Sequence, residues 1–224
     1  MTHTLHRFGR RADLAHDFIV SVMPAKGIND ADAVEKQRAF VRAALKYHPV
    51  NVGDSKRGAA FRPSKTLNPT AHWRRDVAPH PNEVVEDMDQ VTTVSAVFDN
   101  YEAVRSLVAE LKELDLGLSV NISGLPEEAR RCCEECHLVR HSVEYSLGFQ
   151  GRTERLTDDR TLLLTSMCGH GMVGAGFARK MQEWVRAGRR TPKEAATYMA
   201  RFCVCGSFNP ARAEDILGRV AEGR

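Results

Sequence analysis

Residues 91–122, VTTVSAVFDNYEAVRSLVAELKELDLGLSVNI, carry the pattern that decides the fold class. The run from Val91 to Phe98 is rich in β-branched residues and predicts a strand. Apolar residues then recur at the three- and four-residue spacing of one helix face, and they are Val104, Leu107, Val108, Leu111 and Leu114. Leu116 to Ile122 predicts another strand. Because strands and helices alternate, we expect an α/β fold in which they form a layered sandwich.

The first half of the chain shows the same order. Phe18 to Met23 predicts a buried strand, and a helix from about Asp32 to Tyr47 ends just before a proline. In this half the helix lies between the sequences IVSV and PVNVGD. In the second half a helix lies between the similar sequences TVSA and SVNISG. We therefore interpret residues 17–54 and 91–150 as two related strand–helix–strand halves of a single domain, residues 1–224.

A helix and a strand extend the second half. The helix is expected from Pro126 to about His137. After it, Val139 to Leu147 alternates between apolar and polar residues, which predicts a strand. Its buried face is expected to consist of Val139, Val143, Tyr145 and Leu147.

A long loop, residues 49–83, joins the two halves. It holds five of the nine prolines and shows little periodicity. Its basic residues are Lys56, Arg57, Arg62, Lys65, Arg74 and Arg75. Loops of this length inside a compact domain are commonly lids or binding loops. Two interpretations stay open, a solvated connection and a basic flap over a site for a small anionic molecule.

The overall composition limits the classes of partner. The chain has 32 basic and 29 acidic residues and a net charge of +3, which gives no support for nucleic acid or membrane binding. No stretch approaches the roughly 20 apolar residues of a membrane helix, and the N-terminus lacks the apolar centre of a secretory signal. We expect a cytoplasmic protein. The sequence leaves a homo-oligomer or an electron-transfer partner open.

All six cysteines lie in the second half of the chain, in clusters. This is not the dispersed spacing of a disulfide framework, and in a reducing compartment it favours a metal site or reactive thiols. Cys132, Cys133 and Cys136 fall on the helix expected after Pro126. For these three, packing in the core and metal ligation are both open.

Residues 161–224 form the region of the second cluster. Thr161 to Thr165 predicts a short strand that leads into the glycine-rich turn SMCGHGMVGAG. Two helices of similar length are expected at about 177–187 and 192–202, and such a pair folds back as a helical hairpin. The hairpin would carry Cys203 and Cys205 toward Cys168. A final helix is expected after Asn209-Pro210, an N-cap followed by proline at the first helical position.

Three thiolates at one point suit a soft or borderline metal, and we predict an iron–sulfur cluster held by Cys168, Cys203 and Cys205. A fourth ligand could come from His170 or from a thiol of the first cluster. The turn next to a helix start is a natural anion cradle, so Gly169 and Gly171 are expected to line the cofactor.

Four further residues are candidates for this site. Ser166 and Ser207 flank the cysteine loops, and each could donate a hydrogen bond to sulfur or cap the backbone. His141 and Glu144, on the strand expected at 139–147, are candidate acid–base groups, as is His170 in the glycine turn. For His141 the alternative is an ordinary core histidine.

These features predict an enzyme with a 4Fe-4S cluster. Its open iron would act as a Lewis acid on a small anionic substrate, in a lyase, hydratase or desulfurase reaction. The alternative is a non-catalytic metal-binding protein with a structural zinc, or with a cluster that carries electrons or metal. The glycines at 169, 171 and 174 match a dinucleotide motif, but no second parallel strand follows the helix. Hydrolase triads, P-loops and zinc-protease motifs are absent from the sequence.

Overall fold

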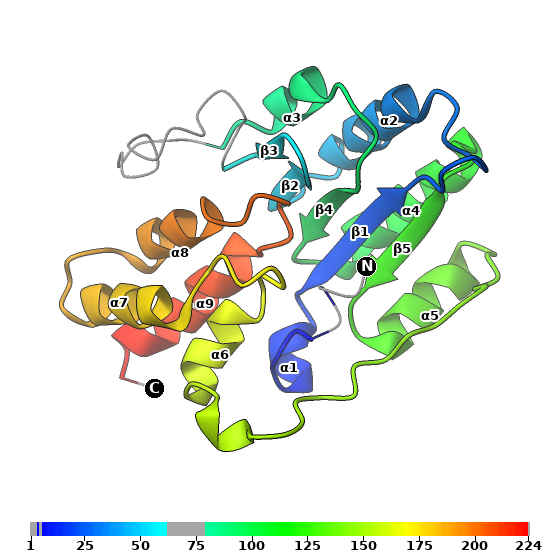
Figure 1. Cartoon of the computed structure of the whole chain (residues 1–224). Coiled ribbons are helices and arrows are strands. Elements are labelled where there is room, and N and C mark those ends of the chain that lie inside the picture. The colour runs from blue at the N-terminus through cyan, green and yellow to red at the C-terminus, as the bar shows by residue number, and fades with distance from the viewer. Residues whose placement is uncertain (1–3, 5, 62–78, 224) are drawn as a thin grey trace.

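The structure is a computed structural model that describes Thr4, residues 6–61 and residues 79–223. Its centre is a five-stranded sheet in the order β3-β2-β4-β1-β5, in which all neighbours are antiparallel. The strands are β1 (Phe18–Met23), β2 (Asn51–Asp54), β3 (Gly58–Ala59), β4 (Val94–Phe98) and β5 (Ser119–Ser123). The predicted α/β class is confirmed (Figure 1).

Two strand–helix–strand units interlock in this sheet. The first is β1, α2 (Ala33–Leu45) and β2, and the second is β4, α4 (Tyr101–Leu114) and β5. Strand β4 lies between the two strands of the first unit, and β1 lies between those of the second, which is a split β-α-β arrangement. The two sequence segments that resemble each other therefore occupy equivalent places. That they are related halves stays a prediction.

Helices α2 and α4 cover one face of the sheet, because they contact each other and β4. Side chains two residues apart in a strand share a face. Phe18 and Val20 therefore point to the same side, and the Phe18 ring meets Tyr101 of α4 at 6.4 Å between centroids. Val20 pairs with Ala96, which pairs with Val52, so this row of the sheet packs against the helices.

Residues 201–209 lie against the other face of the sheet, at β2 and β4. Asn51 and Ser95 point away from that apolar row, and both donate hydrogen bonds to the loop that follows α8. Four helices pack together beside the sheet, and they are α6 (Asp159–Thr165), α7 (Ala175–Arg186), α8 (Pro192–Ala200) and α9 (Pro210–Ala221). Helices α7 and α8 contact each other and form the predicted hairpin. Thr191 and Glu194 form a capping box at the start of α8.

Smaller helices complete the described chain. These are α1 (Arg11–Leu14), α3 (Pro81–Asp87), α5 (Pro126–Glu135) and the 3-10 turn η4 (Thr153–Arg155). Helix α5 packs against α4 and β5 at one edge of the sheet. No helix among the described residues is long and apolar enough to cross a membrane.

Two predicted strands are wrong. Thr161 to Thr165 is not a strand but belongs to helix α6, whose start is capped by Asp158, since Asp158 Oδ1 accepts a hydrogen bond from the amide of Thr161 at 2.9 Å. A short apolar run does not by itself distinguish a strand from a buried helix. Residues 139–147 form no strand either, and each residue from 139 to 150 is exposed.

The long basic loop is partly structured. β2 and β3 form a hairpin within residues 49–61, which corrects the expectation of little regular structure there. At this hairpin Lys56 Nζ donates to Gln90, and Arg57 forms an ion pair with Asp89 at 2.6 Å. The other basic residues of the expected flap, Arg62, Lys65, Arg74 and Arg75, lie outside the described residues.

Candidate functional site

The hairpin of α7 and α8 brings three buried thiols together. Cys168 follows α6, whereas Cys203 and Cys205 follow α8, and their exposed fractions are 3%, 0% and 2%. The sulfurs of Cys203 and Cys205 are 3.8 Å apart, and the Cys203 thiol donates a hydrogen bond to Cys168. The predicted approach of these cysteines is therefore observed in the structure.

The turn after Cys168 stabilises a thiolate. Gly171 has a φ of +68°, and its amide donates to the carbonyl of Cys168 at 2.9 Å. The hydrogen bond from Cys203 lowers the pKa of Cys168 to about 6; burial opposes this shift, whereas the amides of Val173 and Met172 add to it. As the donor, Cys203 has a pKa well above its usual value. The surroundings therefore favour the thiolate form of Cys168 over that of Cys203.

Two polar side chains complete the site. His170 is exposed, and its Nδ1 lies 3.5 Å from the sulfur of the buried Cys205. Ser207 Oγ lies 3.1 Å from the Cys205 sulfur and 3.7 Å from that of Cys203. Both residues were predicted near the cysteines, and the structure brings them there.

The loop with Cys203 and Cys205 is seated directly on the backbone of the sheet. A Cβ atom at Gly53 would lie 2.5 Å from the carbonyl of Cys205, so only glycine fits at this point of β2. Gly206 has a φ of +70°, and a Cβ there would lie 2.5 Å from the amide nitrogen of Gly53. Ser95 Oγ donates to the carbonyl of Cys205 at 2.9 Å. These contacts hold the loop in one position.

A buried ionic network holds the same loop from its other end. Asp17, whose side chain is fully buried, accepts hydrogen bonds from Arg7 at 2.7 and 2.8 Å, from Arg212 at 2.7 Å and from Asn209 at 3.0 Å. Burial alone raises the pKa of Asp17, but the two guanidinium groups hold it below its usual value. Arg7 also donates to the carbonyl of Ser207. The network thus joins the first and last parts of the chain beside the thiols.

Some predicted site residues have other places in the structure. Ser166 Oγ accepts a hydrogen bond from the amide of Phe8 at 2.9 Å, so it caps backbone. His141 and Glu144 lie on the exposed segment 139–150, not on the buried strand that was expected, and among the described residues no contact joins them to the cysteines. Gly169 lies exposed within the turn that follows Cys168.

The first cysteine cluster belongs to the core near the opposite edge of the sheet. Cys132 and Cys136 are buried, and burial together with its neighbour Cys136 raises the pKa of Cys132 to about 12. Helix α5 contacts β5, whereas the loop with Cys205 sits on β2, three strands away. At about 4.8 Å per strand, this separates them by roughly 14 Å. The cluster therefore does not supply a fourth ligand to the site.

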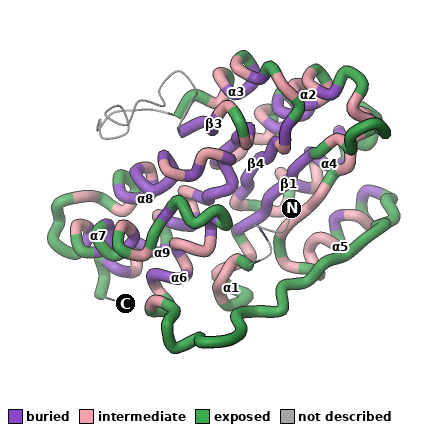
Figure 2. Tube along the Cα trace, in the orientation of Figure 1, coloured by how far each residue is buried: buried purple, intermediate pink, exposed green. Residues whose placement is uncertain are grey.

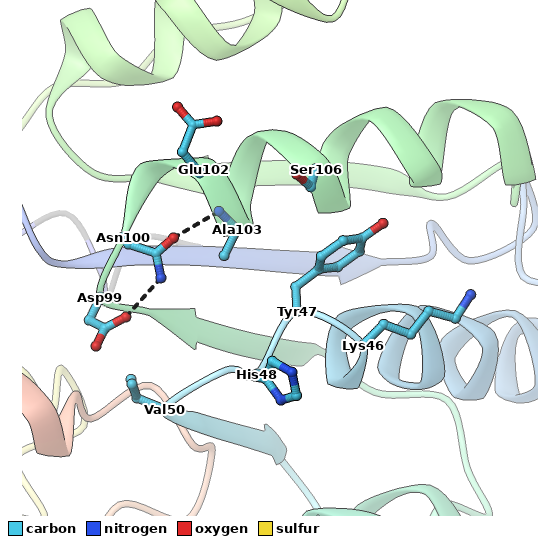
Figure 3. A pocket seen from close by; sticks show the side chains of 9 residues that line it. All are labelled: Lys46, Tyr47, His48, Val50, Asp99, Asn100, Glu102, Ala103 and Ser106. Atoms are coloured by element: carbon cyan, nitrogen blue, oxygen red, sulfur yellow. Dashed lines mark hydrogen bonds between the residues drawn. The ribbon is translucent and has the colours of Figure 1, made fainter.

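Two cavities lie away from the thiols. One, of about 550 Å³, opens between the end of α2 and the start of α4 (Figure 3). There, Asn100 caps α4 by accepting a hydrogen bond from the amide of Ala103 at 2.9 Å. The other, of about 500 Å³, lies between the N-terminal segment and residues 146–162. Neither cavity is lined by Cys168, Cys203 or Cys205.

Some parts of the site were not predicted. Gly53, Asp17 and Arg7 lie more than 140 positions before the cysteine loop, and nothing in their local sequence points to it. For the amides of Met172 and Val173, the sequence provides only a general indication, because amides of a glycine turn before a helix commonly bind anions.

Comparison with known proteins gives no relative from which residues could be transferred. No protein-family model, curated protein or solved structure matches this chain. Within the residues that the structure describes, no group of three or more His, Cys, Asp or Glu side chains is arranged to hold a metal ion. The cysteines interact with one another through hydrogen bonds.

Proposed function

We propose that this chain is a metal-binding protein whose site consists of Cys168, Cys203, Cys205 and His170. The observation that carries the proposal is the spacing of the donors. A tetrahedral zinc ion with bonds of about 2.3 Å to sulfur and about 2.05 Å to nitrogen has sulfur–sulfur edges of about 3.8 Å and sulfur–nitrogen edges of about 3.5 Å. The Cys203–Cys205 and Cys205–His170 separations are 3.8 and 3.5 Å.

The donor set also fits zinc chemically. Three thiolates and one imidazole are a common structural zinc set, and the Cys168 thiolate is already favoured by its surroundings. In the structure the thiols share protons with one another, so ion binding requires the release of those protons. The rigid seat on Gly53 and Gly206 keeps the backbone in place during this change.

A structural role is the one best supported. With four protein ligands, no coordination position remains for a substrate. Cys168 comes from the start of the helical hairpin, while Cys203 and Cys205 come from the loop seated on the sheet. A zinc ion bound there would fasten the C-terminal helices to the sheet.

The iron–sulfur enzyme predicted from the sequence is the second candidate, because three thiols and an exposed His170 could also leave one iron open. In a four-iron cluster, however, each cysteine binds a different iron, which sets the sulfurs farther apart than on a single ion. The 3.8 Å between Cys203 and Cys205 therefore favours one ion.

Metal analysis distinguishes the candidates. We would measure zinc, iron and acid-labile sulfide per chain after purification without oxygen, for the native protein and for Cys203→Ser and Cys205→Ser. Cys133→Ser, on α5, is the matched control and should keep the native content. One zinc without sulfide, lost in both site variants, supports the proposal. Iron with equal sulfide supports the second candidate, and absence of metal from the native protein overturns both.

A further inference from the structure

An exposed apolar segment crosses the surface between α5 and η4. Each residue from 139 to 150 is exposed, and Figure 2 shows this run passing along the outer side of α5. Val139, Val143 and Tyr145 are 97%, 45% and 60% exposed. Among the described residues, no backbone–backbone hydrogen bond is made by residues 139–147. The segment therefore has the alternation of a strand without a neighbouring strand.

The order of side chains in this segment is complementary to itself. If two copies pair antiparallel about a twofold axis through Ser142, residue 140 faces residue 144 of the other copy, and residue 139 faces residue 145. Arg140 then meets Glu144 twice, and Val139 meets Tyr145 twice. Opposite charges and pairs of aromatic with β-branched residues are favourable when they face each other across strands.

The two faces of such a ribbon also differ in the expected way. Positions 140, 142, 144 and 146 carry Arg, Ser, Glu and Ser, so one face is polar. The odd positions place Val139, His141, Val143 and Tyr145 on the other face, which is mainly apolar. A bend at His141 would straighten on pairing.

We infer that this chain forms a homodimer in which residues 139–145 of two copies pair as antiparallel strands about Ser142. A twofold axis makes such an interface isologous. The unpaired backbone N–H and C=O groups of each segment form hydrogen bonds with those of the other. The inference is independent of the metal site, because none of these residues contacts its cysteines in the described structure. It also accounts for the strand that the sequence predicts here and that a single chain does not form.

Charge-swap variants of the full chain test the register. Arg140→Glu places two like-charged pairs in its homodimer, and so does Glu144→Arg, so each variant alone should be monomeric by light scattering after size exclusion. In a mixture of the two, both pairs become attractive, and a heterodimer of twice the chain mass should form. The double variant R140E/E144R restores both pairs and should be dimeric like the native protein.

Cross-linking tests the axis by a separate route. Residue 142 is the only one of the segment that lies opposite the same residue of the second chain. Ser142→Cys should therefore form an intermolecular disulfide under mild oxidation, identified by mass spectrometry. Glu144→Cys, which faces residue 140, is the control and should not link to itself. A native protein that is monomeric overturns the inference, as does a dimer that both single charge variants retain. A dimer cross-linked equally at both positions overturns the register.

Discussion

Replacing Asp17 by asparagine should destabilise the protein far more than removing an exposed ion pair of similar geometry. Asp17 is fully buried between Arg7 and Arg212, whose side chains are only 7% and 3% exposed. The asparagine side chain would keep the shape of the aspartate but leave two buried guanidinium groups without a counter-charge. Breaking a buried pair in this way costs roughly 3–5 kcal/mol. For a chain of this size that lowers the melting temperature by roughly 6–20 °C.

The matched control is Asp89→Asn. Asp89 also accepts two hydrogen bonds from one arginine, Arg57, but it is 56% exposed and solvent screens the pair. Both variants would be unfolded by urea at neutral pH and followed by circular dichroism. A loss of stability in Asp17→Asn no greater than that in Asp89→Asn would refute the reasoning.

Acid provides a second check on the same residue. The pKa of Asp17 in the folded protein lies below its usual value of 3.8, so its ionised form stabilises the fold at every pH above that value. This contribution is lost as the pH falls from 3.8 through the lower folded pKa. The native protein should therefore lose stability in that range, and Asp17→Asn should lose less, because it has no proton to take up there.

Three further outcomes are expected. Gly53→Ala should lose at least about 1–3 kcal/mol of unfolding free energy in the same urea assay, because the added Cβ meets the backbone of Cys205. Gly176→Ala, on α7 with open space around it, should gain about 0.5–1 kcal/mol. In metal-free protein, alkylation of Cys168 by iodoacetamide, followed by mass spectrometry, should accelerate as the pH rises through about 6 and then level off. Ser166→Ala should cost about 0.5–1.5 kcal/mol without changing zinc affinity, whereas Ser207→Ala should weaken zinc binding measured by competition with a chelating dye.

The elements with strong local signals were predictable from the sequence. Helix α4 has a continuous apolar stripe, and α8 and α9 begin with a cap followed by proline. The errors fall where local pattern is ambiguous. Thr161 to Thr165 has an apolar run that suits a strand, but Asp158 caps it as a helix. The segment 139–147 has a strand pattern, but a strand also needs a neighbour, and in the part of the chain that the structure describes no strand lies beside it.

The site was predictable to the extent that it depends on short-range geometry. The helical hairpin of α7 and α8 explains why Cys168, which precedes it, and the Cys203–Cys205 loop, which follows it, meet. Their support was not predictable, because Gly53 and Asp17 act through contacts with residues 152 and more positions away. Such contacts depend on how the helices and the sheet pack, and no local sequence pattern predicts them.

The joining of Asp17 to Arg212 has a consequence for how the chain is made. The two residues are 195 positions apart, and at about 5–20 residues per second a ribosome needs roughly 10–40 s to pass from one to the other. During this interval all five strands can already be outside, while the part that covers their second face has not been synthesised. Gly53, Ser95 and Asn51 then face water in an incomplete chain. Synthesis of the segment that contains Arg212 therefore decides when this part of the protein ceases to be a target for chaperones and proteases.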